Sequence, residues 1–108
     1  MAQKKYNLEI LSPARDEILE IAQLCYALVG PESARKITAK IKDSLDHLRT
    51  HPLMGVMLRD KTLREMGYRM LICGNYICIY KQIGDTVYVY HISDGRSNYP
   101  RLFSDLPK

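Results

Sequence analysis

Apolar and polar residues alternate with a period of two over residues 6–11, and this pattern predicts a half-buried strand at the start of the chain. Residues 14–29 then place apolar side chains at spacings of three and four, which predicts an amphipathic helix. Ser12 offers a hydroxyl for the N-cap and Pro13 suits the first helical position, so we expect the helix to begin there.

A second amphipathic stripe follows over residues 34–48. Gly30 suits the end of the first helix and Pro31 suits the start of the second, while Pro52 limits the second helix to about Thr50. Because the link between the two helices is so short, we expect them to pack as an antiparallel hairpin.

The second half of the chain is rich in β-branched and aromatic residues, which predicts strands over residues 63–66, 68–73, 76–82 and 86–93. Gly74-Asn75 and Gly84-Asp85 predict tight hairpin turns that fix the register. The implied cross-strand pairs are Ile72 with Ile77, Met70 with Ile79, and Ile79 with Tyr90. We expect this apolar face to meet the helical hairpin.

The opposite face of the predicted sheet mixes aromatic, apolar and polar side chains, and we expect it to stay open for function. It carries Arg69, Leu71, Tyr76, Cys78, Tyr80, Val89 and His91. The longest irregular stretch, residues 53–61, is expected to lie beside it.

The predicted element order is β-α-α-β-β-β-β, in the α+β class. The expected architecture is an antiparallel sheet with an N-terminal helical hairpin packed on one face. With 108 residues, the chain is expected to form one domain over residues 1–108.

The chain carries 16 Lys+Arg against 12 Asp+Glu, a net charge of +4. A mild excess of this kind is more often an ordinary solvated surface, but cations interleaved with aromatic rings also suit a nucleic-acid-associated target. The candidate target-binding residues are Arg59, Lys61, Arg64, Tyr80 and Arg101.

RNA cleavage is the one catalytic chemistry for which the sequence offers candidates. It needs groups that move protons, here His91 and Tyr99, and cations that hold the phosphate, here Arg69 and Arg96. The alternatives are structural: a strand histidine bonded to backbone, a tyrosine at the sheet margin, and an exposed cation–π pair of Arg69 with Tyr80.

Other classes of function have little support in the sequence. The three cysteines are expected to be reduced, and His47 and His51 lie too far from any cysteine for a zinc site, so no metal and no cofactor are expected. Residues 1–6 lack the apolar stretch of a signal peptide, and no apolar run is long enough to span a membrane. We therefore expect a cytoplasmic protein.

Several segments share one pattern with a known group of proteins. They are Ser12-Pro13-Ala14-Arg15-Asp16-Glu17-Ile18, Gly67-Tyr68-Arg69-Met70-Leu71, Asn75-Tyr76-Ile77-Cys78-Ile79-Tyr80, Asp94-Gly95-Arg96-Ser97-Asn98-Tyr99 and Leu102-Phe103. In order and spacing they resemble the RelE/ParE superfamily of toxins from bacterial type II toxin–antitoxin modules. The resemblance covers nearly the whole chain and implies the fold expected above.

The resemblance implies one of two activities. RelE-like toxins cleave messenger RNA in the ribosomal A site with basic residues on the sheet and a C-terminal Arg and Tyr, whereas ParE-like toxins poison DNA gyrase. Leu71 and Ile77 stand where the nuclease branch has cations, and the ending around Arg96 and Tyr99 is similar to ParE-type chains, with Ser97 in place of a second Arg. The loss of each such cation costs roughly 2.7–4 kcal/mol of transition-state stabilisation in RNA cleavage. The sequence therefore favours the gyrase poison over the nuclease.

The resemblance thus implies a growth-inhibiting toxin of the plasmid-stabilisation type, neutralised by a cognate antitoxin protein. Its target is expected to be DNA gyrase. The alternatives are a ribosome-dependent messenger RNA endonuclease and an inactive module that only binds the antitoxin.

Overall fold

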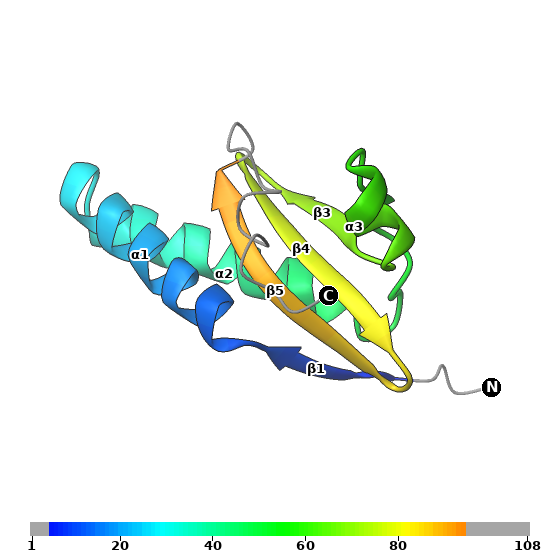
Figure 1. Cartoon of the computed structure of the whole chain (residues 1–108). Coiled ribbons are helices and arrows are strands. Elements are labelled where there is room, and N and C mark those ends of the chain that lie inside the picture. Colours follow the sequence, from blue (N-terminus) through cyan, green and yellow to red (C-terminus); the bar gives the residue numbers. More distant parts are fainter. Residues whose placement is uncertain (1–4, 95–108) are drawn as a thin grey trace.

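The computed structural model describes residues 5–94, and Figure 1 shows their arrangement. The first half of the chain contains β1 (Asn7–Ile10), α1 (Ser12–Leu28) and α2 (Pro31–His47). The second half contains β2 (Val56–Met57), α3 (Lys61–Glu65), β3 (Arg69–Cys73), β4 (Tyr76–Ile83) and β5 (Thr86–Asp94). The two long helices form the predicted hairpin; α2 passes behind the sheet in this view, and α1 lies to its left.

The sheet has five strands in the order β1-β5-β4-β3-β2. The pairs from β2 to β5 are antiparallel, but β1 runs parallel to β5, with Asn7 opposite Thr86 and Ile10 opposite Val89. The α+β class and its helical layer are confirmed, whereas the prediction of a wholly antiparallel sheet is wrong. Parallel strands need a long connection, and here all the elements between β1 and β5 supply it.

The helix ends differ from the sequence prediction in two places. Ser12 is the first helical residue of α1, and Leu11 is the N-cap without any side-chain capping bond. α2 ends at His47, and a turn closed by the Thr50 and His51 amides on the His47 carbonyl follows it. Gly30 precedes α2 with a φ of 133°, a conformation that L side chains rarely adopt, so this tight link requires glycine.

Two clusters of buried side chains lie on opposite faces of the sheet. The hairpin cluster joins the helices to one face and contains Ala14, Ile41, Leu45, Leu48, Cys73, Cys78, Tyr80, Val87, Val89 and Ile92. The far cluster contains Leu58, Leu63, Tyr68, Ile77 and Ile79, with Met70 and Tyr90 packed against it.

The predicted assignment of the two faces is therefore wrong. Tyr80 and Cys78 are fully buried beneath the helices, and Ile77 and Ile79 lie on the far face. Both faces of β3 and β4 are apolar, so the alternation along these strands defines two faces without saying which one the helices cover.

The cross-strand register agrees with prediction over most of β3 and β4. Ile72 pairs with Ile77 and Met70 pairs with Ile79 as predicted. On the other side, Ile79 pairs with His91 because an irregularity at Ile79/Tyr80 leaves Tyr90 as an extra residue. The predicted pairing of Ile79 with Tyr90 is wrong for that reason.

The segment between α2 and β3 is more ordered than predicted. Residues 63–66 belong to a helical turn and not to a strand, because the Asp60 carboxylate accepts a 3.0 Å hydrogen bond from the Leu63 amide and caps α3. Residues 53–61, expected to be irregular, contain the short strand β2. Within residues 5–94, no helix combines the length and the apolar character that a membrane crossing requires.

Candidate functional site

The structure describes six of the nine candidate site residues, namely Arg59, Lys61, Arg64, Arg69, Tyr80 and His91. Arg96, Tyr99 and Arg101 lie outside the described residues. The six do not share one site: three are exposed on or beside α3, and three are engaged within the fold.

Arg69 and Tyr80 hold the segment before β2 against the sheet. They are opposite each other on β3 and β4. The Arg69 guanidinium donates hydrogen bonds to the carbonyls of Gly55, at 2.9 Å, and Leu53, at 3.4 Å. The Tyr80 hydroxyl accepts a 2.9 Å hydrogen bond from the Gly55 amide, and burial raises its pKa. Tyr80 was expected to bind a target from an open face, and its complete burial makes that expectation wrong.

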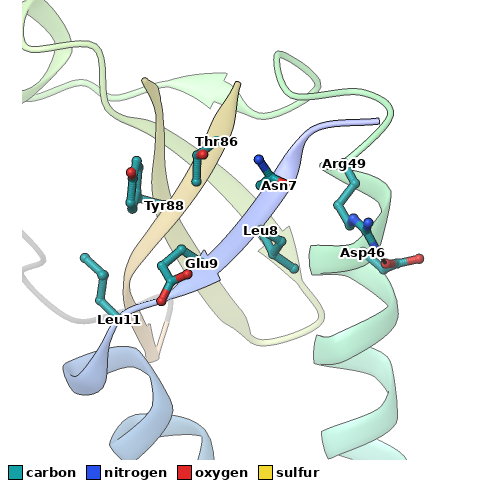
Figure 2. A pocket seen from close by; sticks show the side chains of 8 residues that line it. All are labelled: Asn7, Leu8, Glu9, Leu11, Asp46, Arg49, Thr86 and Tyr88. Carbon is teal, nitrogen blue, oxygen red and sulfur yellow. Dashed lines mark ion pairs between the residues drawn. The ribbon is translucent and has the colours of Figure 1, made fainter. Parts of the chain in front are cut away.

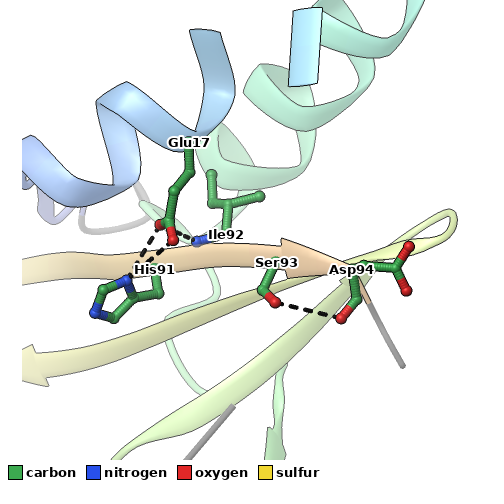
Figure 3. A network of polar contacts seen from close by, with 5 residues as sticks. All are labelled: Glu17, His91, Ile92, Ser93 and Asp94. Atoms are coloured by element: carbon green, nitrogen blue, oxygen red, sulfur yellow. Dashed lines mark hydrogen bonds and ion pairs between the residues drawn. The ribbon is translucent and has the colours of Figure 1, made fainter. Parts of the chain in front are cut away.

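His91 is held by an acidic residue of α1 (Figure 3). Its Nδ1 atom lies 3.2 Å from Oε1 and 3.3 Å from Oε2 of Glu17. The same carboxylate accepts a 2.9 Å hydrogen bond from the Ile92 amide, at a part of β5 beyond its pairing with β1. Glu17 therefore links α1 to the edge of the sheet.

Sequence reasoning missed Glu17 as a partner of His91. The available signal was its position three residues after Ala14 and four before Ile21, beside the apolar stripe that faces the core. A carboxylate at such a position needs a partner, because burying it without one is costly.

Arg59, Lys61 and Arg64 form an exposed basic group at α3. The packing of Leu63 into the far cluster fixes this short helix beside β3, as Figure 1 shows. Asp60 offsets part of the charge, but its carboxylate is committed to capping the helix. Of the predicted target-binding residues that the structure describes, these three are available to a partner.

Aromatic rings and a cation also gather on the far face. Tyr68 and Tyr90 meet edge to face with their centroids 4.9 Å apart, and the Lys81 ammonium lies 5.1 Å from the Tyr68 centroid. Burial, together with Tyr90, raises the pKa of Tyr68 to about 12, so its phenol stays protonated at neutral pH and is a poor general base.

Two hollows in the surface differ in their relation to the candidate residues, because only the smaller one is lined by any of them. The larger, of about 890 Å³, runs along β1 and is lined by residues that include Glu9, Asp46, Arg49 and Tyr88 (Figure 2). Its two closest opposite charges pair with each other, because Arg49 lies 3.6 Å from Asp46 and also donates to the Tyr6 carbonyl. The smaller, of about 220 Å³, is lined by Leu53, Met57, Gly67, Tyr68, Arg69 and Gln82.

No group of three or more His, Cys, Asp or Glu side chains within residues 5–94 is arranged to hold a metal ion.

Comparison with known protein families decides the identity of the chain. A family model described as the ParE toxin of the type II toxin-antitoxin system parDE matches residues 8–99. The chain belongs to this ParE toxin family. The resemblance seen in the sequence is therefore confirmed, and the protein is a toxin of the type II toxin–antitoxin class.

Solved structures show that the ParE-family toxin shares its fold with several related proteins. The chromosomal ParDE system from P. aeruginosa gives a TM-score of 0.71 at 18% identity, over 84% of this chain and 97% of that chain. The RelBE2 toxin–antitoxin complex from Mycobacterium tuberculosis gives a TM-score of 0.64 at 17% identity, and the match covers 89% of this chain and 98% of that chain. A double mutant of the E. coli toxin RelE in the free state gives a TM-score of 0.62 at 15% identity, and the match covers 93% of this chain and 92% of that chain. A search of curated proteins finds no match by sequence.

In this ParE-family toxin, the two described candidates for RNA cleavage, Arg69 and His91, lie apart in space. Arg69 pairs with Tyr80 and His91 pairs with Ile79. Because adjacent residues of β4 point to opposite faces, Arg69 and His91 lie on opposite faces of the sheet. A phosphate held by Arg69 would therefore be out of reach of a proton carried by His91.

Proposed function

We propose that this ParE-family toxin arrests growth by binding DNA gyrase and inhibiting it, without cleaving RNA. The observation that carries the proposal is the separation of Arg69 from His91 on the two faces of the sheet. Each of them is also committed to a bond within the fold, Arg69 to Gly55 and His91 to Glu17. These contacts support structural roles for both residues.

The exposed cations of α3 are the proposed contact with the target. Gyrase works while bound to DNA, and cations beside its DNA path would gain favourable electrostatic contacts. The test is a double charge reversal, Lys61→Glu with Arg64→Glu, compared with Lys36→Glu and Lys42→Glu on α2 as a control of equal charge change. We expect the α3 variant to lose inhibition of supercoiling and the α2 control to keep it.

Three measurements separate the three candidate functions. Purified toxin should inhibit supercoiling by gyrase, and unchanged supercoiling at saturating toxin would refute the proposal. Codon-aligned cuts in messenger RNA after induction would favour the ribosome-dependent endonuclease. Normal growth during expression without the antitoxin would favour an inactive binding module. Since both targets are cytoplasmic, we propose that the toxin acts in the cytoplasm.

We also propose that a cognate antitoxin covers the outer end of the helical hairpin. Large apolar side chains are exposed there, including Leu28 at 74% and Val29 at 73%. Large apolar side chains exposed at one end of a hairpin are typical of an interaction site. Family membership and the RelBE2 complex support an antitoxin as its occupant. Replacing Leu28 and Val29 by Asp should abolish co-purification with the antitoxin, while Lys36→Glu should not.

A further inference from the structure

Two cysteines meet at the tip of the β3–β4 hairpin. The Sγ atoms of Cys73 and Cys78 lie 3.2 Å apart. Both side chains are buried in the hairpin cluster, and both cysteines are free thiols. Neither residue belongs to the proposed contact with gyrase.

The surroundings of the two sulfur atoms differ. A Cβ built on Gly74 would lie 3.2 Å from the Lys40 ammonium, so this cation sits next to Cys73. Hydrogen bonding from Cys78, then from the Ser44 hydroxyl, and the charge of Lys40 lower the pKa of Cys73 to about 7. Burial opposes this lowering. The pKa of Cys78 is raised by the hydrogen bond of Cys78 to Cys73 and by the burial of Cys78. The pKa of Cys73 still lies below that of Cys78, so Cys73 is the thiol of the pair that ionises more readily.

We propose that Cys73 and Cys78 are an oxidation site, at which a peroxide closes a reversible disulfide beneath α2. The thiolate is the reactive form of cysteine, so Cys73 attacks one peroxide oxygen and becomes a sulfenic acid, while the other oxygen leaves as hydroxide. The Cys78 sulfur then attacks Cys73 Sγ. One S–S bond forms, and the displaced hydroxyl leaves with the Cys78 proton as water. The hydroxide takes up the proton that Cys73 released on ionising, so in sum two thiols lose two electrons and two protons, and hydrogen peroxide is reduced to two waters.

The register explains why this disulfide would be labile. Cys73 pairs directly with Tyr76, and Cys78 pairs with Leu71, so the two cysteines are diagonal neighbours. Diagonal positions lie about 7–8 Å apart, whereas disulfides usually span about 4.4–6.8 Å between Cα atoms. Closing the bond must draw the strands together, and a bond under such strain is readily reduced. Transient disulfides of this kind are the form that reducing compartments permit.

Oxidation would also act on the packing of α2. Ile41 and Leu45 belong to the same buried cluster as the two sulfur atoms. Moving β3 toward β4 at this position therefore changes the surface on which α2 rests. The site couples the oxidation state of the cell to the helical layer of the toxin.

The test uses the full chain with Cys25→Ser, so that only the pair remains. Trypsin cleaves after Arg69 and Lys81, which places both cysteines in the single fragment 70–81. After hydrogen peroxide we expect this fragment to lose about 2 Da and to recover its mass in dithiothreitol. Oxidation of Met70 in the same fragment adds about 16 Da and is not reversed by dithiothreitol, so the two reactions are distinct.

Single variants test the assigned roles. With Cys78→Ala, Cys73 should accumulate a sulfenic acid that dimedone traps, and with Cys73→Ala the remaining Cys78 should stay unmodified. Lys40→Met should slow the oxidation severalfold, whereas Lys36→Met, at an exposed position of the same helix, should leave its rate unchanged. The proposal is overturned if both thiols survive peroxide levels that oxidise Met70, or if the two alanine variants react equally. Neither outcome depends on whether the toxin inhibits gyrase.

Discussion

The amide of Gly55 donates a 2.9 Å hydrogen bond to the hydroxyl of Tyr80, which is fully buried beneath the helical hairpin. Through this bond, a residue of the segment before β2 satisfies the polar end of a side chain in the core. A buried hydroxyl without a partner would destabilise the fold, so the segment and the core depend on each other.

Removing the Tyr80 hydroxyl should destabilise the toxin. Tyr80→Phe leaves the buried Gly55 amide without its acceptor, at a cost of about 1–3 kcal/mol in the free energy of unfolding. Urea unfolding followed by circular dichroism measures the change. Tyr26→Phe is the control, because that side chain is 61% exposed. Equal stability of the two variants would show that the bond contributes nothing.

Gly55 should not tolerate a side chain. A Cβ at this position would lie 2.7 Å from Cε1 and the hydroxyl of Tyr80 and 2.8 Å from the Met70 carbonyl oxygen. Because the carbonyl belongs to the β3 backbone, it cannot rotate away as a side chain could. Gly55→Ala should lower the free energy of unfolding by about 1–3 kcal/mol, as overpacking does. A thermal midpoint equal to that of the wild type would contradict this packing.

Glu17 should stabilise the toxin mainly through the Ile92 amide. Glu17→Ala removes the acceptor of that amide and the partner of His91, and we expect a loss of about 1–3 kcal/mol in the free energy of unfolding. Glu17→Gln keeps an acceptor oxygen and should lower the free energy of unfolding by less than Glu17→Ala does. Urea unfolding measures both, with Glu20→Ala at an exposed position of α1 as the control. If Gln proves as harmful as Ala, the charge facing His91 matters more than the Ile92 bond.

The raised pKa of Tyr68 should make the toxin unstable at high pH. The folded state keeps this proton up to a pKa of about 12, whereas the unfolded chain releases it near the ordinary value of 10.0. The stabilisation is therefore complete below pH 10 and is lost as the pH rises from 10 to 12, with a total of roughly 2–3 kcal/mol. Tyr68→Phe should reduce this decline, and Tyr26→Phe should not. Unfolding midpoints measured across that pH range provide the check.

Local signals in the sequence were sufficient to predict most of the secondary structure. The Gly30-Pro31 link predicts the helical hairpin, and the two glycine turns predict the β3–β4 and β4–β5 hairpins with most of their register. These features depend on neighbouring residues, whose conformational preferences are strong. The capped turn of α3 was missed, because residues 63–66 were predicted to be a strand, although the signal was local: Asp60 precedes Leu63 by the spacing of an N-cap bond.

Features that depend on distant residues were not readable in the same way. The alternation along β4 separates Tyr80 from Ile79 but does not say which of them faces the helices. The pairing of β1 with β5 joins residues 7–10 to residues 86–89 without any local signal. The site could not be predicted for the same reason. Arg69 binds Gly55 and His91 binds Glu17, and each of these partners is remote in sequence.

The parallel pairing of β1 with β5 has a consequence for the synthesis of the toxin. The earliest strand to leave the ribosome must wait for one of the last, because no other strand of residues 5–94 pairs with it. A nascent chain halted before residue 86 leaves β1 without a neighbour and cannot complete the native sheet. Prematurely terminated products should thus be inactive, and the folded toxin should exist only once translation of this region is finished.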